Sequence, residues 1–131
     1  MKKILFTSYL GISSLLCLNC SSNNDEESNY KEFERMPISV IGDWRPVNAA
    51  TKVSLTFTEE ANIPKLYISR SGKYFQGRPL YLKGGDGSFY FKFNGDVNLS
   101  KLNYKRVNNF IYVFNLEDSG ALNFNEEFIK Q

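Results

Sequence analysis

Apolar and polar residues alternate along most of the chain that follows Pro37. Val53, Leu55 and Phe57 are separated by hydroxyl residues, and the run 89–93 places phenylalanine at every second position. A period of two is typical of antiparallel strands that bury one face. The other runs that we expect to form strands are 38–47, 66–69, 80–82, 102–106, 110–116 and 121–124.

Turn-forming residues fall at the ends of these runs. Asn94-Gly95 is a strong hairpin signal, because both residue types tolerate the positive φ that a tight turn requires. The other turn signals are the segments 71–72, 84–87, 108–109 and 118–120. After Met36, only residues 126–130 show a trace of helical period. About seven to nine short strands therefore predict an all-β fold, a small antiparallel meander that closes into a barrel, with a sandwich as the alternative.

The first twenty residues have the organisation of an export signal. Lys2 and Lys3 precede the uncharged, largely apolar segment 4–18, which is shorter than the roughly 20 residues that a membrane-spanning helix needs. Two cysteines, Cys17 and Cys20, close this segment, and a polar stretch follows at once.

The same segment resembles the signal peptide of bacterial lipoproteins, in which a cysteine becomes the first residue of the mature chain and carries acyl groups. The resemblance implies a signal peptide at residues 1–19 and lipid attachment at Cys20, although Asn19 stands where the family usually has a small residue. It places the protein in a bacterial cell envelope. Within this resemblance, Ser21 is compatible with the outer membrane, and the acidic residues 25–27 resemble a signal for export to the cell surface, with a solvated tether as the alternative for these charges. An ordinary cleaved signal and an uncleaved anchor are the alternatives.

The remaining chain divides into a tether and one domain. Residues 20–36 are expected to hold the acylated cysteine and a flexible tether, because 21–36 is polar and has no apolar period. Residues 37–131 are expected to form a small β-barrel domain, long enough for one core and too short for two. Residues 21–131 contain no cysteine, so this domain folds without a disulfide.

Gly42-Asp43-Trp44 resembles the Gly-x-Trp motif of lipocalin-like proteins, and the run 110–124 is similar to their closing strands. The resemblance implies that Trp44 plugs one end of the barrel. The family often packs an arginine from near the last strand on this tryptophan, but no arginine follows Arg106 in this chain. A core tryptophan after a turn is the simpler interpretation of the same residues.

The lipocalin resemblance also implies an interior pocket for a small apolar ligand. The inward side chains that would line it are Val53, Leu55, Phe57, Leu66, Ile68, Phe89, Phe91 and Phe93. Small barrels can instead fill their interior with side chains. The high aromatic content, eleven Phe, eight Tyr and one Trp, favours the filled barrel.

Residues 69–77, preceded by 53–57, carry a second resemblance. They are similar to the strand-turn-strand of META-type envelope domains and, more loosely, to lysozyme-inhibitor lipoproteins. This resemblance implies a structural or inhibitory envelope factor that contacts its partner through the Ser71-Gly72 loop.

The residue types present argue against catalysis. The chain has no histidine, which removes the commonest general base, the commonest zinc ligand and every Ser-His or Cys-His nucleophile. The acidic pairs 59–60 and 126–127 are typical of solvated turns or tails. Asp86 and Asp96 lie in glycine-rich turns, where aspartate favours tight backbone geometry. We therefore expect no enzyme, no metal site and no cofactor.

Basic residues concentrate in one part of the chain. Between Ala61 and Leu116, nine Lys and Arg accompany two Asp, a local net charge of +7, and tyrosines are interleaved with them. The residues that we expect to form a basic binding face are Arg70, Lys73, Tyr74, Arg78, Tyr81, Lys83, Tyr90 and Lys92. Such a face suits an anionic glycan or protein, whereas export excludes nucleic acid. A solvated barrel exterior is the alternative.

The sequence thus predicts a lipid-anchored envelope lipoprotein that contacts the membrane through its acyl chains. Its role would be non-catalytic binding of a small apolar ligand or an anionic macromolecule. The oligomeric state is left open.

Overall fold

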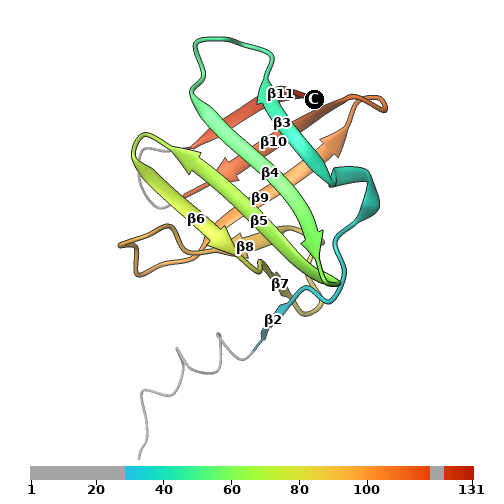
Figure 1. Cartoon of the computed structure of the whole chain (residues 1–131). Coiled ribbons are helices and arrows are strands. Elements are labelled where there is room, and N and C mark those ends of the chain that lie inside the picture. Colours follow the sequence, from blue (N-terminus) through green and yellow to red (C-terminus); the bar gives the residue numbers. More distant parts are fainter. Residues whose placement is uncertain (1–28, 119–122) are drawn as a thin grey trace, which may run out of the picture. The chain divides into compact units, whose positions relative to one another are not determined.

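The computed structural model describes residues 29–118 and 123–131 (Figure 1). Residues Lys31–Gln131 form one compact unit. The expected signal peptide, Cys20 and most of the expected tether lie outside the described residues. Within the described residues, no helix is long and apolar enough to cross a membrane.

The described residues form ten strands of a single antiparallel sheet, in the order β2-β7-β8-β9-β10-β11-β3-β4-β5-β6. The elements are β2 (Tyr30–Glu32), the 3₁₀ turn η1 (Ile38–Val40), β3 (Gly42–Pro46), β4 (Val53–Glu60), β5 (Ile63–Arg70), β6 (Lys73–Gly77), β7 (Leu80–Leu82), β8 (Phe89–Phe91), β9 (Ser100–Arg106), β10 (Ile111–Glu117) and β11 (Phe124–Lys130). The described residues contain no α-helix. The prediction of an all-β antiparallel meander is confirmed.

The sheet curls because the two ends of the meander meet. β3 pairs with its sequence neighbour β4 and also with β11, far along the chain. In Figure 1 the green and yellow strands β4, β5 and β6 lie in front of the orange strands β9 and β10. On the other side, the backbone N–H of Asn94 donates to the carbonyl oxygen of Tyr74 in β6 at 2.9 Å. This bond joins β6 to the segment that follows β8, so the sheet bends toward a barrel.

The strand registers define two ends of this curled sheet. One end of the sheet contains the start of β3, the end of β4, the start of β10 and the end of β11. The turn η1 immediately precedes β3 at this end. We call this the η1 end. The opposite end carries the segments 47–52, 71–72 and 94–99, and we call it the groove end.

The core fills the inside of the curl. All eight inward side chains expected from the period of two are buried, with exposures between 0 and 8%. Aromatic rings meet across the interior: Phe57 lies 4.9 Å from Phe89 and 5.8 Å from Phe114, measured between ring centroids. Side chains from opposite strands therefore occupy the centre of the sheet.

Residues 38–40 differ from the expected strand over 38–47. They form η1, and the strand begins only at Gly42, whose φ of +142° lies in the region that favours glycine. Pro37 starts the turn, and the N–H of Val40 donates to its carbonyl oxygen. Val40 is fully buried and its own carbonyl oxygen accepts a hydrogen bond from the indole of Trp44. The carbonyl group that accepts the indole hydrogen bond therefore belongs to a turn and not to an extended strand.

Two further boundaries differ from the sequence analysis. The folded unit begins at Lys31, before Pro37, because Phe33 and Met36 pack against the core. The N–H of Met36 donates to a carboxylate oxygen of Glu59 at 2.5 Å. Residues 126–130, which show a trace of helical period, belong to strand β11.

Candidate functional site

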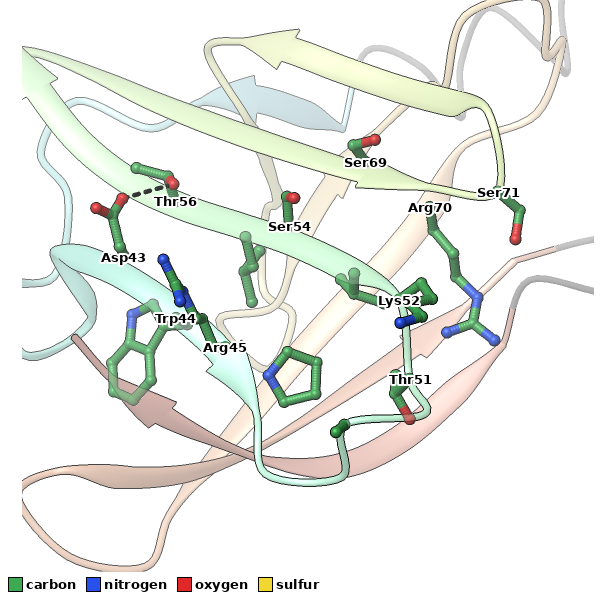
Figure 2. A pocket seen from close by; sticks show the side chains of 14 residues that line it. Asp43, Trp44, Arg45, Thr51, Lys52, Ser54, Thr56, Ser69, Arg70 and Ser71 are labelled. Atoms are coloured by element: carbon green, nitrogen blue, oxygen red, sulfur yellow. Dashed lines mark hydrogen bonds between the residues drawn. The ribbon is translucent and has the colours of Figure 1, made fainter.

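A groove opens between β3 and β4 at the groove end. The two strands pair only as far as Trp44 opposite Leu55, whereas β3 continues beside β11 up to Pro46. Proline has no N–H to donate to a neighbouring strand, and residues 47–52 then carry the chain away from the sheet. The separation of the two strands leaves an open groove of about 780 Å³ (Figure 2).

The groove is lined mainly by cationic and hydroxyl side chains. Asp43 and Arg45 on β3, and Ser54 and Thr56 on β4, face outward because they alternate with buried Trp44 and Leu55. The polar side chains of the lining are Asp43, Arg45, Thr51, Lys52, Ser54, Thr56, Ser69, Arg70 and Ser71. Three cationic, one carboxylate and five hydroxyl side chains thus line the groove.

Arg70 is the most constrained of the three cations. It lies opposite Val53 and two positions after buried Ile68, so it belongs to the inward face at the end of β5. Its guanidinium carbon lies 5.4 Å from the centroid of the Phe124 ring, within cation–π range. Its Nε and Nη1 atoms are buried and have no hydrogen-bond acceptor among the described residues. Buried donors without an acceptor are costly, which favours an anion or water beside them.

The other charges of the groove have different surroundings. Within the described part of the chain, Arg45 and Lys52 form no ion pair. The carboxylate of Asp43 accepts a hydrogen bond from the Thr56 hydroxyl at 2.7 Å, as the dashed line in Figure 2 shows. The Thr51 hydroxyl donates to Glu126 at 2.5 Å. The net charge of the lining is therefore positive, and two of its cations are available to an anion.

The residues of the predicted binding face lie in several places. Arg70 lines the groove just described, whereas Arg78, Tyr81 and Lys83 line a second groove of about 490 Å³ together with Lys31, Glu32 and Glu34. In that second groove the basic charge is offset, because Arg78 lies 3.6 Å from the carboxylate of Glu32.

The remaining residues of the predicted binding face differ from one another in burial and in their partners. Lys73 forms an ion pair of 2.7 Å with Asp96, which raises the pKa of the lysine through the hydrogen bond. Tyr74 and Lys92 are exposed, and Tyr90 is buried. The structure therefore brings together Arg78, Tyr81 and Lys83, and separates them from Arg70.

Arg45, Lys52 and the hydroxyl side chains of the groove are site residues that the sequence pattern does not predict. Every outward position of β4 from Ser54 to Thr58 carries a hydroxyl group, and that signal was available in the sequence. On its own, this alternation predicts only a half-buried strand. Arg45 had no comparable signal, because its place in the groove depends on where β3 leaves β4.

Trp44 lies in the core near the η1 end. Its ring contacts Tyr112 and Phe114, with centroid distances of 4.8 and 5.2 Å. Its Nε1 donates to the carbonyl oxygen of Val40 at 2.8 Å, and the ammonium of Lys130 lies 5.3 Å from the ring centroid. A lysine from the last strand therefore contacts the indole, in a chain that has no arginine after Arg106.

The acidic turn residues have structural partners. Asp86 accepts a hydrogen bond from the N–H of Ser88 at 3.0 Å, and its other carboxylate oxygen lies 3.2 Å from the Lys101 ammonium. In the described residues, no group of three or more acidic or cysteine side chains is arranged to hold a metal ion.

The surroundings of Asp86 predict a pH-dependent contribution to stability. Hydrogen bonds from Ser88 and the nearby Lys101 lower the pKa of Asp86 to about 2 from its ordinary 3.8. A lowered pKa stabilises the fold above pH 4, and this contribution is lost as the pH falls from 4 to 2. We expect Asp86→Asn to lower the free energy of unfolding at pH 7 by less than about 1 kcal/mol, because the pair is exposed. Urea unfolding at several pH values should show this difference disappearing toward pH 2; a difference independent of pH would contradict the assignment.

The fold and the groove define a class, a small all-β domain with a filled interior and a basic, hydroxyl-lined groove on its surface. Comparison with protein-family models, with curated proteins and with solved structures gave no match.

Proposed function

We propose that this protein is a lipid-anchored, non-catalytic binding protein of a bacterial envelope, and that the groove between β3 and β4 binds an anionic, hydroxyl-rich ligand such as an acidic glycan. The observation that carries the proposal is the lining of the groove, in which Arg45, Lys52 and Arg70 accompany five hydroxyl side chains. Cationic side chains attract carboxylate, sulfate or phosphate groups. Hydroxyl side chains can both donate and accept hydrogen bonds with sugar hydroxyls.

The location of this groove favours an anionic ligand over a small apolar one. An apolar ligand would need the interior of the sheet, where the rings of Phe57, Phe89 and Phe114 pack against one another. The groove between β3 and β4 is instead open to solvent, and most of the side chains that line it are polar. The lipid anchor is supported by the apolar segment 4–18 and by Cys20 at its end.

The test is binding of sulfated dextran oligosaccharides, with unsulfated dextran as the neutral control. We expect Arg45→Gln and Lys52→Gln to weaken binding of the sulfated probe to the full acylated chain about 10-fold each, the equivalent of about 1.4 kcal/mol. Affinity should also fall as the salt concentration rises. Isothermal titration calorimetry in detergent gives the dissociation constants.

Lys65→Gln is the matched control for net charge. Lys65 also faces outward from the same sheet, but it pairs with Glu60 at 3.1 Å and does not line the groove. Equal weakening by Lys65→Gln would show attraction to net charge alone. Equal binding of neutral dextran, or loss of binding in Arg78→Gln and Lys83→Gln instead, would overturn the assignment to this groove.

A further inference from the structure

Three apolar side chains project into solvent at the η1 end. Ile38 in η1 is 84% exposed, and Val107 and Phe110, which flank the turn between β9 and β10, are 52% and 64% exposed. We call these three residues the apolar rim. Water contact with large apolar side chains is unfavourable, and an exposed group of them marks an interaction surface.

The two parts of the apolar rim lie on either side of Lys130. The backbone N–H of Lys130 donates to the carbonyl oxygen of Phe110 at 2.8 Å. Its side-chain ammonium donates to the carbonyl oxygen of Ser39, the neighbour of Ile38, at 3.3 Å. One residue of β11 therefore links η1 to the turn between β9 and β10.

The turn that carries Val107 and Phe110 is held by hydrogen bonds. The side-chain oxygen of Asn108 accepts from the N–H groups of Phe110 and Ile111, both at 2.8 Å. The N–H of Val107 donates to the carbonyl oxygen of Ile111 at 2.9 Å. The two apolar side chains are thus presented on a preformed turn rather than on a loose loop.

Basic residues adjoin the apolar rim. Lys105 and Arg106 precede Val107 and are exposed, and the Arg106 guanidinium donates to Asn109 across the turn. Apolar side chains flanked by cations match the chemistry of a bilayer surface, where acyl chains lie beneath phosphate groups.

The segment that leads into η1 is also held at this end. The side chain of Arg35 and the backbone N–H of Met36 donate hydrogen bonds to the Glu59 carboxylate. Glu59 lies near the end of β4, beyond Phe57, which pairs with Gly42 at the start of β3. Only ten residues separate Cys20 from Lys31. A chain of that length spans at most about 35 Å when fully extended. A lipid anchor at Cys20 would therefore keep the folded unit within about 35 Å of the bilayer, a reach that allows the η1 end to touch the lipid.

We infer that the apolar rim docks the η1 end of the domain onto the lipid surface that carries the anchor. Ile38, Val107 and Phe110 enter the interfacial layer, and Lys105 and Arg106 contact lipid phosphates. This inference rests on the proposed lipid anchor at Cys20. It adds an orientation, because the groove lined by Lys52 and Arg70 lies toward the opposite end of the sheet.

The test uses the full acylated chain in vesicles of phosphatidylethanolamine and phosphatidylglycerol. Residues 21–131 contain no cysteine, so Val107→Cys provides a single site for an environment-sensitive fluorophore. We expect a blue-shifted emission that nitroxide lipids quench. Val97→Cys is the control, because Val97 is 83% exposed in the 94–99 segment at the groove end. Its label should remain in water.

A second variant separates docking from simple proximity. Phe110→Ser in the Val107→Cys background should remove most of the shift and of the quenching, while circular dichroism shows an unchanged fold. Equal signals at positions 107 and 97, or no effect of Phe110→Ser, would overturn the docking. A shift seen in native envelopes but not in pure lipid vesicles would assign the rim to a protein partner instead.

Palmitate incorporation, measured on the same preparations, distinguishes the two proposals. Palmitate that is lost in Cys20→Ala but retained in Cys17→Ala establishes the anchor. If the anchor is present and the label at position 107 stays in water, docking alone fails. If no palmitate is attached at Cys20, the anchor and the docking that rests on it fail together.

Discussion

Replacement of Trp44 by alanine is expected to lower the free energy of unfolding by about 3–5 kcal/mol. Trp44 is fully buried and its ring packs against Tyr112 and Phe114. The substitution would leave a cavity beneath η1 and remove the donor that satisfies the carbonyl oxygen of Val40. The contact between the Lys130 ammonium and the indole ring would also be lost.

Urea unfolding followed by far-UV circular dichroism measures this effect, since the variant has no tryptophan fluorescence. Trp44→Phe is the matched control. It keeps an aromatic ring in the core but removes the indole N–H, so a smaller loss is expected, on the order of 1–3 kcal/mol from the unsatisfied carbonyl and partial cavity. A loss below about 1 kcal/mol for Trp44→Ala would show that the residue does not hold this end of the core.

Phe114→Ala should have an effect of similar size, about 3–5 kcal/mol. Phe114 is fully buried in the middle of β10. Its ring meets five others at centroid distances of 5.2 to 6.2 Å, those of Trp44, Phe57, Tyr104, Tyr112 and Phe128. These rings come from five strands, so the cavity would lie where both halves of the meander meet.

Phe110→Ala is the control for Phe114→Ala. Phe110 lies just before β10 and is 64% exposed, so its truncation should change stability by no more than about 0.5 kcal/mol. The same urea measurement, made without lipid, compares the two variants. Similar losses for both would mean that the buried ring cluster does not dominate the stability of the domain.

The fold class could be predicted because the residue pattern that determines it is local. Alternation of Val53, Leu55 and Phe57 with hydroxyl residues identifies β4 and its buried face without knowledge of any other strand. Residues 38–40 could not be assigned in this way, since they are apolar enough for a strand. Their 3₁₀ turn depends on the buried indole of Trp44, which needs the carbonyl oxygen of Val40.

The candidate site was harder to predict, because the groove exists only where β3 and β4 stop pairing. Arg70 was selected from its charge, but its neighbours in the groove come from β3, β4 and the segment between them. Charge spacing along the chain grouped Arg70 with Lys73 and Arg78, whose charges meet Asp96 and Glu32 instead. Only the register of β3 against β4 and β11 shows that Arg45 faces the same groove.

The pairing of β3 with β11 has a consequence for how the chain folds. Neighbouring strands such as β4 and β5 can pair through a short hairpin. Trp44 and Lys130 also pair, but nearly the whole sequence of the domain lies between them. Bringing such distant segments together requires a large loss of chain entropy before the contact stabilises anything. We therefore expect the local hairpins to form early, and the β3–β11 ladder to form late and to limit the folding rate.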